Sequence, residues 1–131
     1  MAFVSREIVI ESSADAVWKV IGVFETGPSR MAPGFVVDTK AEGDLRVVTF
    51  ADGTVVTERR ISVDDDARRI AYSIVGERIE HDNAVMQVFD DGERCRMVWS
   101  RDVLPDAMVP RLSQAMEQGL DVIKKTFDSA H

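Results

Sequence analysis

Two side chains in the sequence are candidates for proton transfer. Glu58 is the one carboxylate in the middle of a strand-like run, and His81 is the only histidine apart from His131 at the end of the chain. A general acid or base needs a titratable group inside a cleft, and histidine titrates near neutral pH. The role of either residue therefore depends on which face of its strand it occupies.

Other side chains are candidates for binding a polar ligand group. Arg59, Tyr72, Trp99 and Arg101 each lie within strand-like runs that are otherwise rich in apolar residues. Burying an unpaired charge is costly, so each arginine needs a partner, water or a ligand. Arg101 has two interpretations: a strand-end ion pair with Asp82, or a cationic group at the rim that contacts a ligand oxygen.

The elements that position these residues follow from hydrophobic periodicity and turn signals. Residues 3–10 are predicted to form a strand and 14–24 a short amphipathic helix, with one helical turn between Gly27 and Gly34. A long amphipathic helix begins near Pro105. Between the two helical regions, further strands are predicted at 35–42, 45–51, 54–63, 67–76, 82–90 and 93–102.

Turn positions predict which side chains share a face of this sheet, because residues alternate between faces along a strand. We take Asp52-Gly53, Asp65-Asp66 and Asp91-Gly92 as two-residue turns. Glu58 and His81 then point outward, which leaves no predicted catalytic residue. The predicted inner face contains Phe35, Val37, Val48, Phe50, Val55, Thr57, Arg59, Ile61, Ile70, Tyr72, Ile74, Asp82, Met86, Met97, Trp99 and Arg101.

The C-terminal helix supplies the opposite wall of the predicted cavity. Its apolar stripe includes Met108, Leu112 and Met116, and methionine suits adaptable pockets. We therefore predict that these ligand-binding residues line a cavity: Phe35, Phe50, Arg59, Tyr72, Met86, Met97, Trp99, Arg101, Met108, Leu112 and Met116.

Composition narrows the class of protein. The 131 residues fit one domain, 1–131, and the net charge of −7 argues against binding nucleic acid or an anionic membrane surface. With one cysteine and two histidines, the sequence does not predict a metal site. It also contains no glycine-rich phosphate loop, and we predict no cofactor. Without a signal-like or membrane-spanning segment, we expect a cytoplasmic monomer or homodimer with no integral membrane association.

The order of elements, with four short segments, resembles the SRPBCC superfamily. These segments are 11–18 (ESSADAVW), 56–63 (VTERRISV), 95–105 (CRMVWSRDVLP) and 116–124 (MEQGLDVIK). The superfamily includes START domains, birch-pollen allergen-like proteins and the polyketide cyclase/dehydrase-like branch, which this chain is most similar to. The resemblance implies an α+β helix-grip fold, in which a seven-stranded curved antiparallel sheet wraps around the long C-terminal helix. It also implies a hydrophobic cavity for lipids, polyketides or aromatic compounds.

Two functions compete at this stage. The first is binding or transport of a small hydrophobic ligand in the cavity. The alternative is an enzyme of the polyketide cyclase/dehydratase type, in which Arg or Tyr groups stabilise an enolate-like oxyanion. The predicted inner face favours binding, because its one acid–base pair is Asp82 with Arg101.

Overall fold

The computed structural model describes residues 1–129 and contains one sheet and a long helix. The elements are β1 (Ala2–Ile10), α1 (Ala14–Ile21), α2 (Gly27–Met31), β2 (Val36–Glu42), β3 (Leu45–Phe50), β4 (Val55–Asp64), β5 (Arg69–Val75), β6 (His81–Asp91), β7 (Arg94–Leu104), a 3-10 turn (Asp106–Met108) and α3 (Val109–Ser129). The sheet is antiparallel with strand order β1-β7-β6-β5-β4-β3-β2. The predicted helix-grip architecture is confirmed, including the two short helices between the first two strands.

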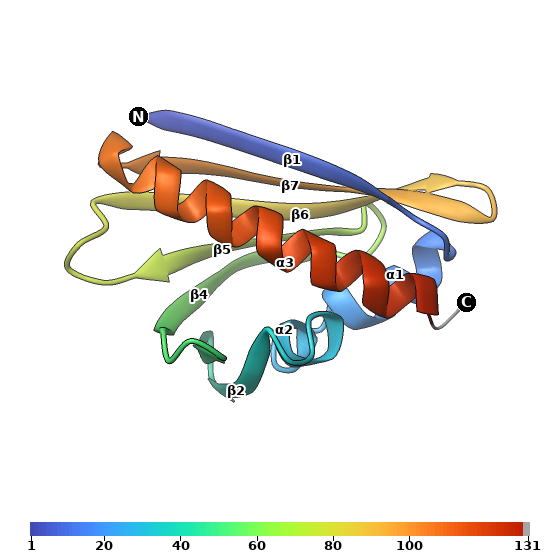
Figure 1. Ribbon diagram of the computed structural model, residues 1–131, viewed down its shortest axis with the longest axis horizontal. Helices are drawn as coiled ribbons and strands as arrows, with labels where there is room; N and C mark the ends of the chain where they lie inside the picture. Colours follow the sequence, from blue (N-terminus) through green and yellow to red (C-terminus); the bar gives the residue numbers. More distant parts are fainter. Residues whose placement is uncertain (130–131) are drawn as a thin grey trace.

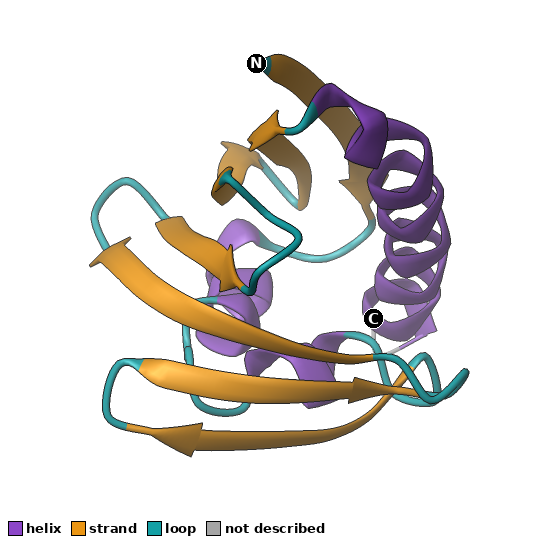
Figure 2. Cartoon of the chain, turned by 90° about the vertical axis from the view of Figure 1, so that its left-hand side faces the viewer, coloured by secondary structure: helices purple, strands orange, loops and turns teal. Residues whose placement is uncertain are grey.

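Helix α3 lies against the concave side of the sheet and is fastened to β1. Figure 1 shows it running the length of the molecule, and Figure 2 shows the sheet curving away from it. The Arg6 guanidinium contacts Glu117 at 3.1 Å, and Lys124 Nζ donates to the Val9 carbonyl at 2.6 Å. Buried residues of its apolar stripe include Leu112, Met116, Gly119, Leu120, Ile123 and Phe127.

Helix α1 packs against β6 and β7 and covers another part of the concave face. Ser13 caps it, since its hydroxyl accepts a hydrogen bond from the Ala16 amide at 3.2 Å. Val17 and Trp18 are buried in the core, as the helical spacing predicts. The Trp18 indole N–H donates to Asp65 in the β4–β5 turn at 3.0 Å, so the ring has a polar partner at its edge.

The register of β3 and β4 differs from the prediction by one residue. As a result, Glu58 and Arg59 exchange the faces of the sheet on which they were predicted to lie. The loop between the strands holds three residues, 51–53, because the Phe50 amide donates to the Thr54 carbonyl and Gly53 adopts a φ of 91°. Arg46 therefore lies opposite Glu58, and Leu45 lies opposite Arg59. The predictions that Glu58 points outward and Arg59 inward are both wrong.

Irregular pairing elsewhere explains the remaining errors on the inner face. Pairing shifts between Val36 and Asp38 and between Arg60 and Ser62, so Val37 and Ile61 are 57% and 50% exposed. Val55 is 60% exposed because the longer β3–β4 loop turns it outward. His81 is exposed, as predicted.

In contrast, the β6–β7 hairpin keeps its predicted faces although its register differs. Asp91 pairs with Arg94, so the turn residues are Gly92 and Glu93 in place of the predicted Asp91 and Gly92. Met86 consequently faces Trp99 in place of Met97. A change of one position on each strand slides the pairing by two residues, which preserves the face of each side chain.

The end of the β5–β6 ladder is closed by a side chain. Backbone pairing stops at Tyr72 and Ala84, although β5 continues to Val75. Beyond that point the Ile74 amide donates to Asp82 Oδ2 at 2.8 Å. The carboxylate of Asp82 thus replaces a backbone acceptor between the two strands.

Candidate functional site

A groove of about 1020 Å³ lies between the open end of the sheet and the first half of α3. This volume lies just above the range of roughly 300–1,000 Å³ found for ligand pockets. Apolar and aromatic side chains make up much of its wall, including Phe35, Phe50, Val56, Ile74, Ile79, Trp99, Met108, Leu112, Ala115 and Met116. Charged residues at its edges are Asp52, Glu77, Arg78 and Arg111.

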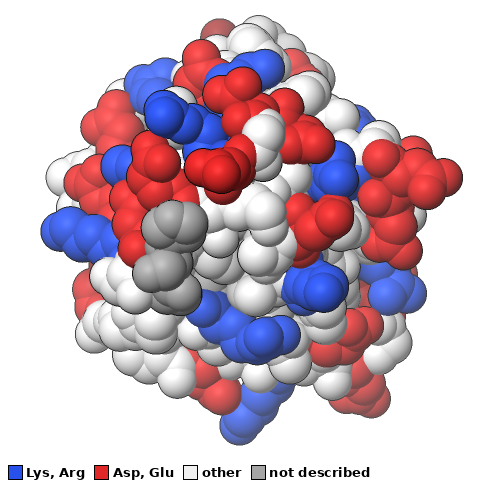
Figure 3. Space-filling model, turned by 90° about the vertical axis from the view of Figure 1, so that its right-hand side faces the viewer, with Lys and Arg blue, Asp and Glu red and all other residues white. Residues whose placement is uncertain are grey.

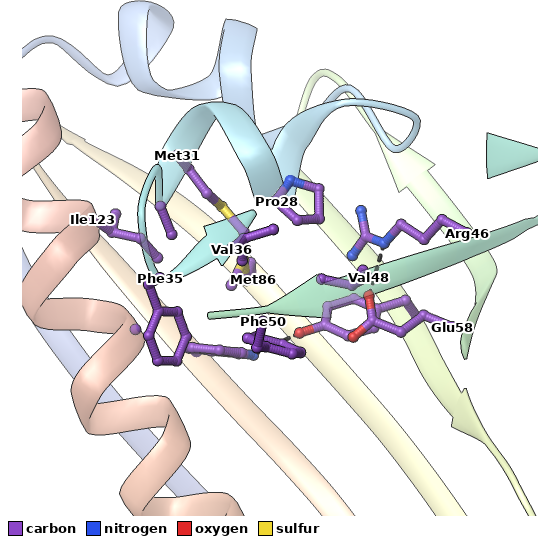
Figure 4. A pocket seen from close by; sticks show the side chains of 14 residues that line it. Pro28, Met31, Phe35, Val36, Arg46, Val48, Phe50, Glu58, Met86 and Ile123 are labelled. Atoms are coloured by element: carbon purple, nitrogen blue, oxygen red, sulfur yellow. Dashed lines mark hydrogen bonds and ion pairs between the residues drawn. The ribbon is translucent and has the colours of Figure 1, made fainter. Parts of the chain in front are cut away.

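A second, smaller cavity of about 50 Å³ lies deeper, toward α2. Its lining includes Met31, Val36, Val48, Met86 and Ile123 with the polar residues Arg46, Glu58 and Tyr72. Figure 4 shows Phe35 beside α3 and the side chains of Arg46 and Glu58 directed at each other. Phe35 and Phe50 pack edge to face with ring centroids 5.3 Å apart.

The structure brings most of the predicted ligand-binding residues to these two cavities. Phe35, Phe50, Trp99, Arg101, Met108, Leu112 and Met116 line the groove, and Tyr72 and Met86 line the deeper pocket. Met97 is buried in the hydrophobic core and is absent from both linings. Arg59 projects outward beside Asp44, with its Nε 3.6 Å from the carboxylate. Contact of any of these residues with a ligand stays a prediction.

Sequence reasoning missed a buried ion pair between Arg46 and Glu58. Arg46 Nε lies 2.7 Å from Glu58 Oε1, and Nη1 donates to the Phe24 carbonyl at 2.9 Å. The guanidinium also stacks between the Phe24 and Tyr72 rings, at 4.4 Å and 4.9 Å from their centroids. One signal was available, because Arg46 shares strand parity with Val48 and Phe50.

The predicted pair of Arg101 and Asp82 is present and buried. Arg101 Nε lies 2.7 Å from Asp82 Oδ1, with the geometry of an ion pair and not of an aligned hydrogen bond. Burial raises the pKa of the Asp82 carboxyl, while the positive charge of Arg101 and the Ile74 amide act against that shift. The ion-pair interpretation of Arg101 is therefore confirmed, and because Arg101 also lines the groove, its contact with a ligand oxygen stays a prediction.

Tyr72 lies between the two ion pairs. Its hydroxyl accepts a hydrogen bond from Trp99 Nε1 at 3.0 Å, and Arg101 Cζ lies 5.8 Å from its ring centroid. Burial raises the pKa of Tyr72 to about 12, although the nearby arginines lower it. The phenol is therefore neutral at physiological pH and keeps a proton that it can donate.

Removal of one partner of the buried Arg46–Glu58 ion pair should destabilise the folded protein. We expect Arg46→Met to lower the free energy of unfolding by about 3–5 kcal/mol, because Glu58 would keep a buried, unpaired charge. The matched control is Arg59→Met, whose side chain is 53% exposed and should change stability by only about 0–1 kcal/mol. Urea denaturation measures both, and equal losses would contradict the assignment of the pair.

The single tyrosine gives a direct test of its environment. Tyrosinate absorbance of the folded protein should rise near pH 12, whereas the urea-unfolded chain should titrate near pH 10. Because the folded-state pKa is the higher one, Tyr72 stabilises the fold fully below about pH 10. That contribution is lost as the pH rises from 10 to 12. Titration of the native protein near pH 10 would show that the phenol is not desolvated.

The face of the molecule shown in Figure 3 has no patch made of a single kind of charge. There, lysine and arginine side chains are interspersed with aspartate and glutamate around an uncharged centre. Within residues 1–129, no helix is both long enough and apolar enough to span a membrane.

Solved structures with the same fold come from bacteria and a plant. XoxI from Bacillus cereus is 23% identical, with a TM-score of 0.86 and coverage of 100% of this chain and 99% of that one. An uncharacterised protein from Bacillus thuringiensis is 21% identical, with a TM-score of 0.84 and coverage of 96% and 98%. Norcoclaurine synthase from Thalictrum flavum is 21% identical, with a TM-score of 0.67 and coverage of 95% and 84%.

Family membership rests on the sequence profile, since likeness at this level of identity shows the fold alone. No curated protein matches the chain in sequence. The profile described as "Polyketide cyclase / dehydrase and lipid transport" matches residues 1–128, nearly the whole chain. The chain therefore belongs to the polyketide cyclase/dehydrase and lipid-transport family of SRPBCC proteins.

Proposed function

We propose that this protein binds a small hydrophobic ligand, such as a lipid, polyketide or aromatic compound, in the groove between the sheet and α3. The observation that carries the proposal is the volume of about 1020 Å³ with an extensive apolar wall. Such a wall excludes water from an apolar ligand, and the few polar groups within it orient the molecule. The cytoplasmic location and the monomeric or homodimeric state stay predictions from the sequence.

A probe-binding experiment tests the groove. N-phenyl-naphthylamine, whose fluorescence rises in apolar surroundings, should show saturable binding to the wild-type protein. Ala115→Phe places a ring in the groove and should weaken probe binding at least about tenfold, which corresponds to 1.4 kcal/mol. Lys125→Phe adds the same ring at an exposed position of α3 and should leave binding unchanged.

Two results would contradict binding of the probe in the groove. Absence of saturable binding to the wild type would overturn the proposed function. Equal affinity of the Ala115→Phe protein and the wild type would show that the probe occupies another place.

A second candidate is an enzyme of the polyketide cyclase/dehydratase type, and the position of Glu58 favours it. Glu58 lines both cavities, and its Oε2 accepts no hydrogen bond from any residue in 1–129. In this mechanism Glu58 accepts a proton from the carbon beside a ligand carbonyl, while Tyr72 or Arg101 donates a hydrogen bond to the developing enolate oxygen. The enolate then expels the β-hydroxyl group, which leaves as water with the proton that Glu58 holds.

Native mass spectrometry separates carrier from enzyme. The ligand-free protein is mixed with a hydrophobic β-hydroxy ketone, and the mass of the bound species is followed over time. A carrier returns the same mass, whereas a dehydratase returns a species lighter by one water. Glu58→Gln should abolish such a change while the compound still binds, and an unchanged rate in this variant would exclude Glu58 as the base.

A further inference from the structure

The groove and the deeper pocket are neighbours that share part of their wall. The side chains that line both cavities are Phe35, Phe50, Glu58 and Trp99, so a ligand group would reach the deeper pocket by passing between them, and we call this boundary the passage. A water molecule needs roughly 10–15 Å³ of such space, so about 50 Å³ admits a group of a few atoms and excludes a ring system. The deeper pocket therefore has the size of a subsite for one end of a ligand.

Two polar groups at this pocket have unused hydrogen-bonding capacity. Arg46 occupies Oε1 of Glu58, but Oε2 accepts no hydrogen bond from residues 1–129. The Tyr72 hydroxyl accepts from Trp99, and no described side chain or carbonyl accepts its own proton. Glu58 is 7% exposed and Tyr72 2% exposed, so other molecules reach these polar groups mainly through the cavities that they line.

A hydroxyl group matches both residues at once. Its proton can be donated to the Glu58 carboxylate, and its oxygen can accept the Tyr72 proton. Hydrogen bonds to a charged group in a low-dielectric site are stronger than those between neutral groups. An alkyl end or an ether would leave at least one of these two groups unpaired.

Gly119 controls how closely α3 approaches this passage. It lines the deeper pocket, and a Cβ at this position would lie 3.4 Å from both Phe35 Cε2 and Trp99 Cζ3. A methyl group therefore fits at van der Waals contact. A longer side chain has to displace the two rings that form the passage, which would narrow or close it.

We infer that the deeper pocket is a subsite for a hydroxyl-bearing end of the ligand, and that Gly119 determines access to it. The inference rests on the proposed function, because the rest of the ligand occupies the groove. It adds a chemical requirement, one small hydroxyl end on an apolar body, and a residue that sets its selectivity.

Matched naphthalene derivatives test the subsite by competition with N-phenyl-naphthylamine. Hydroxynaphthalene should bind the wild type about tenfold or more tightly than naphthalene or methoxynaphthalene. Gly119→Ala should keep that preference, whereas Gly119→Leu should remove it. Lys125→Leu, on the exposed face of α3, should keep it. Tyr72→Phe, which removes only the donor hydroxyl, should reduce the preference by several-fold.

The outcomes distinguish the subsite from the groove. Equal affinity of the wild type for hydroxynaphthalene and naphthalene, with probe binding intact, overturns the subsite and leaves the proposed function standing. A preference that persists in Gly119→Leu overturns the role of Gly119. If that variant does not fold, loss of the preference in Tyr72→Phe supports the subsite and its persistence there overturns it. Failure of the wild type to bind any of these compounds overturns both proposals.

Discussion

One helix cannot cover a sheet of this width, and that mismatch creates the interior of the molecule. Seven strands at about 4.8 Å spacing make a sheet nearly three times as wide as a helix of about 10 Å diameter. Helix α3 is fastened to β1 at one edge, and α1 and α2 fill one end of the concave face. The remaining concave surface, at the end formed by β4, β5 and the start of α3, stays open as the groove.

The polar groups of this interior occur as compensated pairs. Arg46 with Glu58 and Arg101 with Asp82 place two positive and two negative charges around Tyr72. Such pairs contribute little net stability compared with apolar packing, because desolvation opposes their attraction. Their value lies in holding polar atoms at fixed positions in an otherwise apolar cavity. Glu58, Tyr72 and Arg101 keep hydrogen-bonding capacity toward that cavity, which suits either orientation of a ligand or its chemistry.

The elements and their order were predictable because they depend on local periodicity, but part of the site depends on single residues in loops. A third residue in the β3–β4 loop reversed the facing of Glu58 and Arg59, and extra residues at Val37 and Ile61 did the same locally. The predicted position of the β6–β7 turn was also wrong. Trp99 and Arg101 nevertheless lie on the predicted face, because the strand pairing is displaced by two residues and side chains alternate with a period of two. Loop length and bulges leave a weak trace in sequence, since several turn types accept the same aspartate and glycine residues.

The carboxylate of Asp82 makes the outer end of β5 mechanically distinct from the rest of the sheet. Residues 73–75 pair with β4 but have no backbone pairing with β6, so across this gap the two strands are bridged by the Ile74–Asp82 hydrogen bond, next to the loop of residues 76–80 that connects them. Ile74 and Arg101 both line the groove, and Asp82 contacts each of them. One carboxylate therefore serves two purposes at the groove wall: it terminates the strand edge and it balances a buried positive charge.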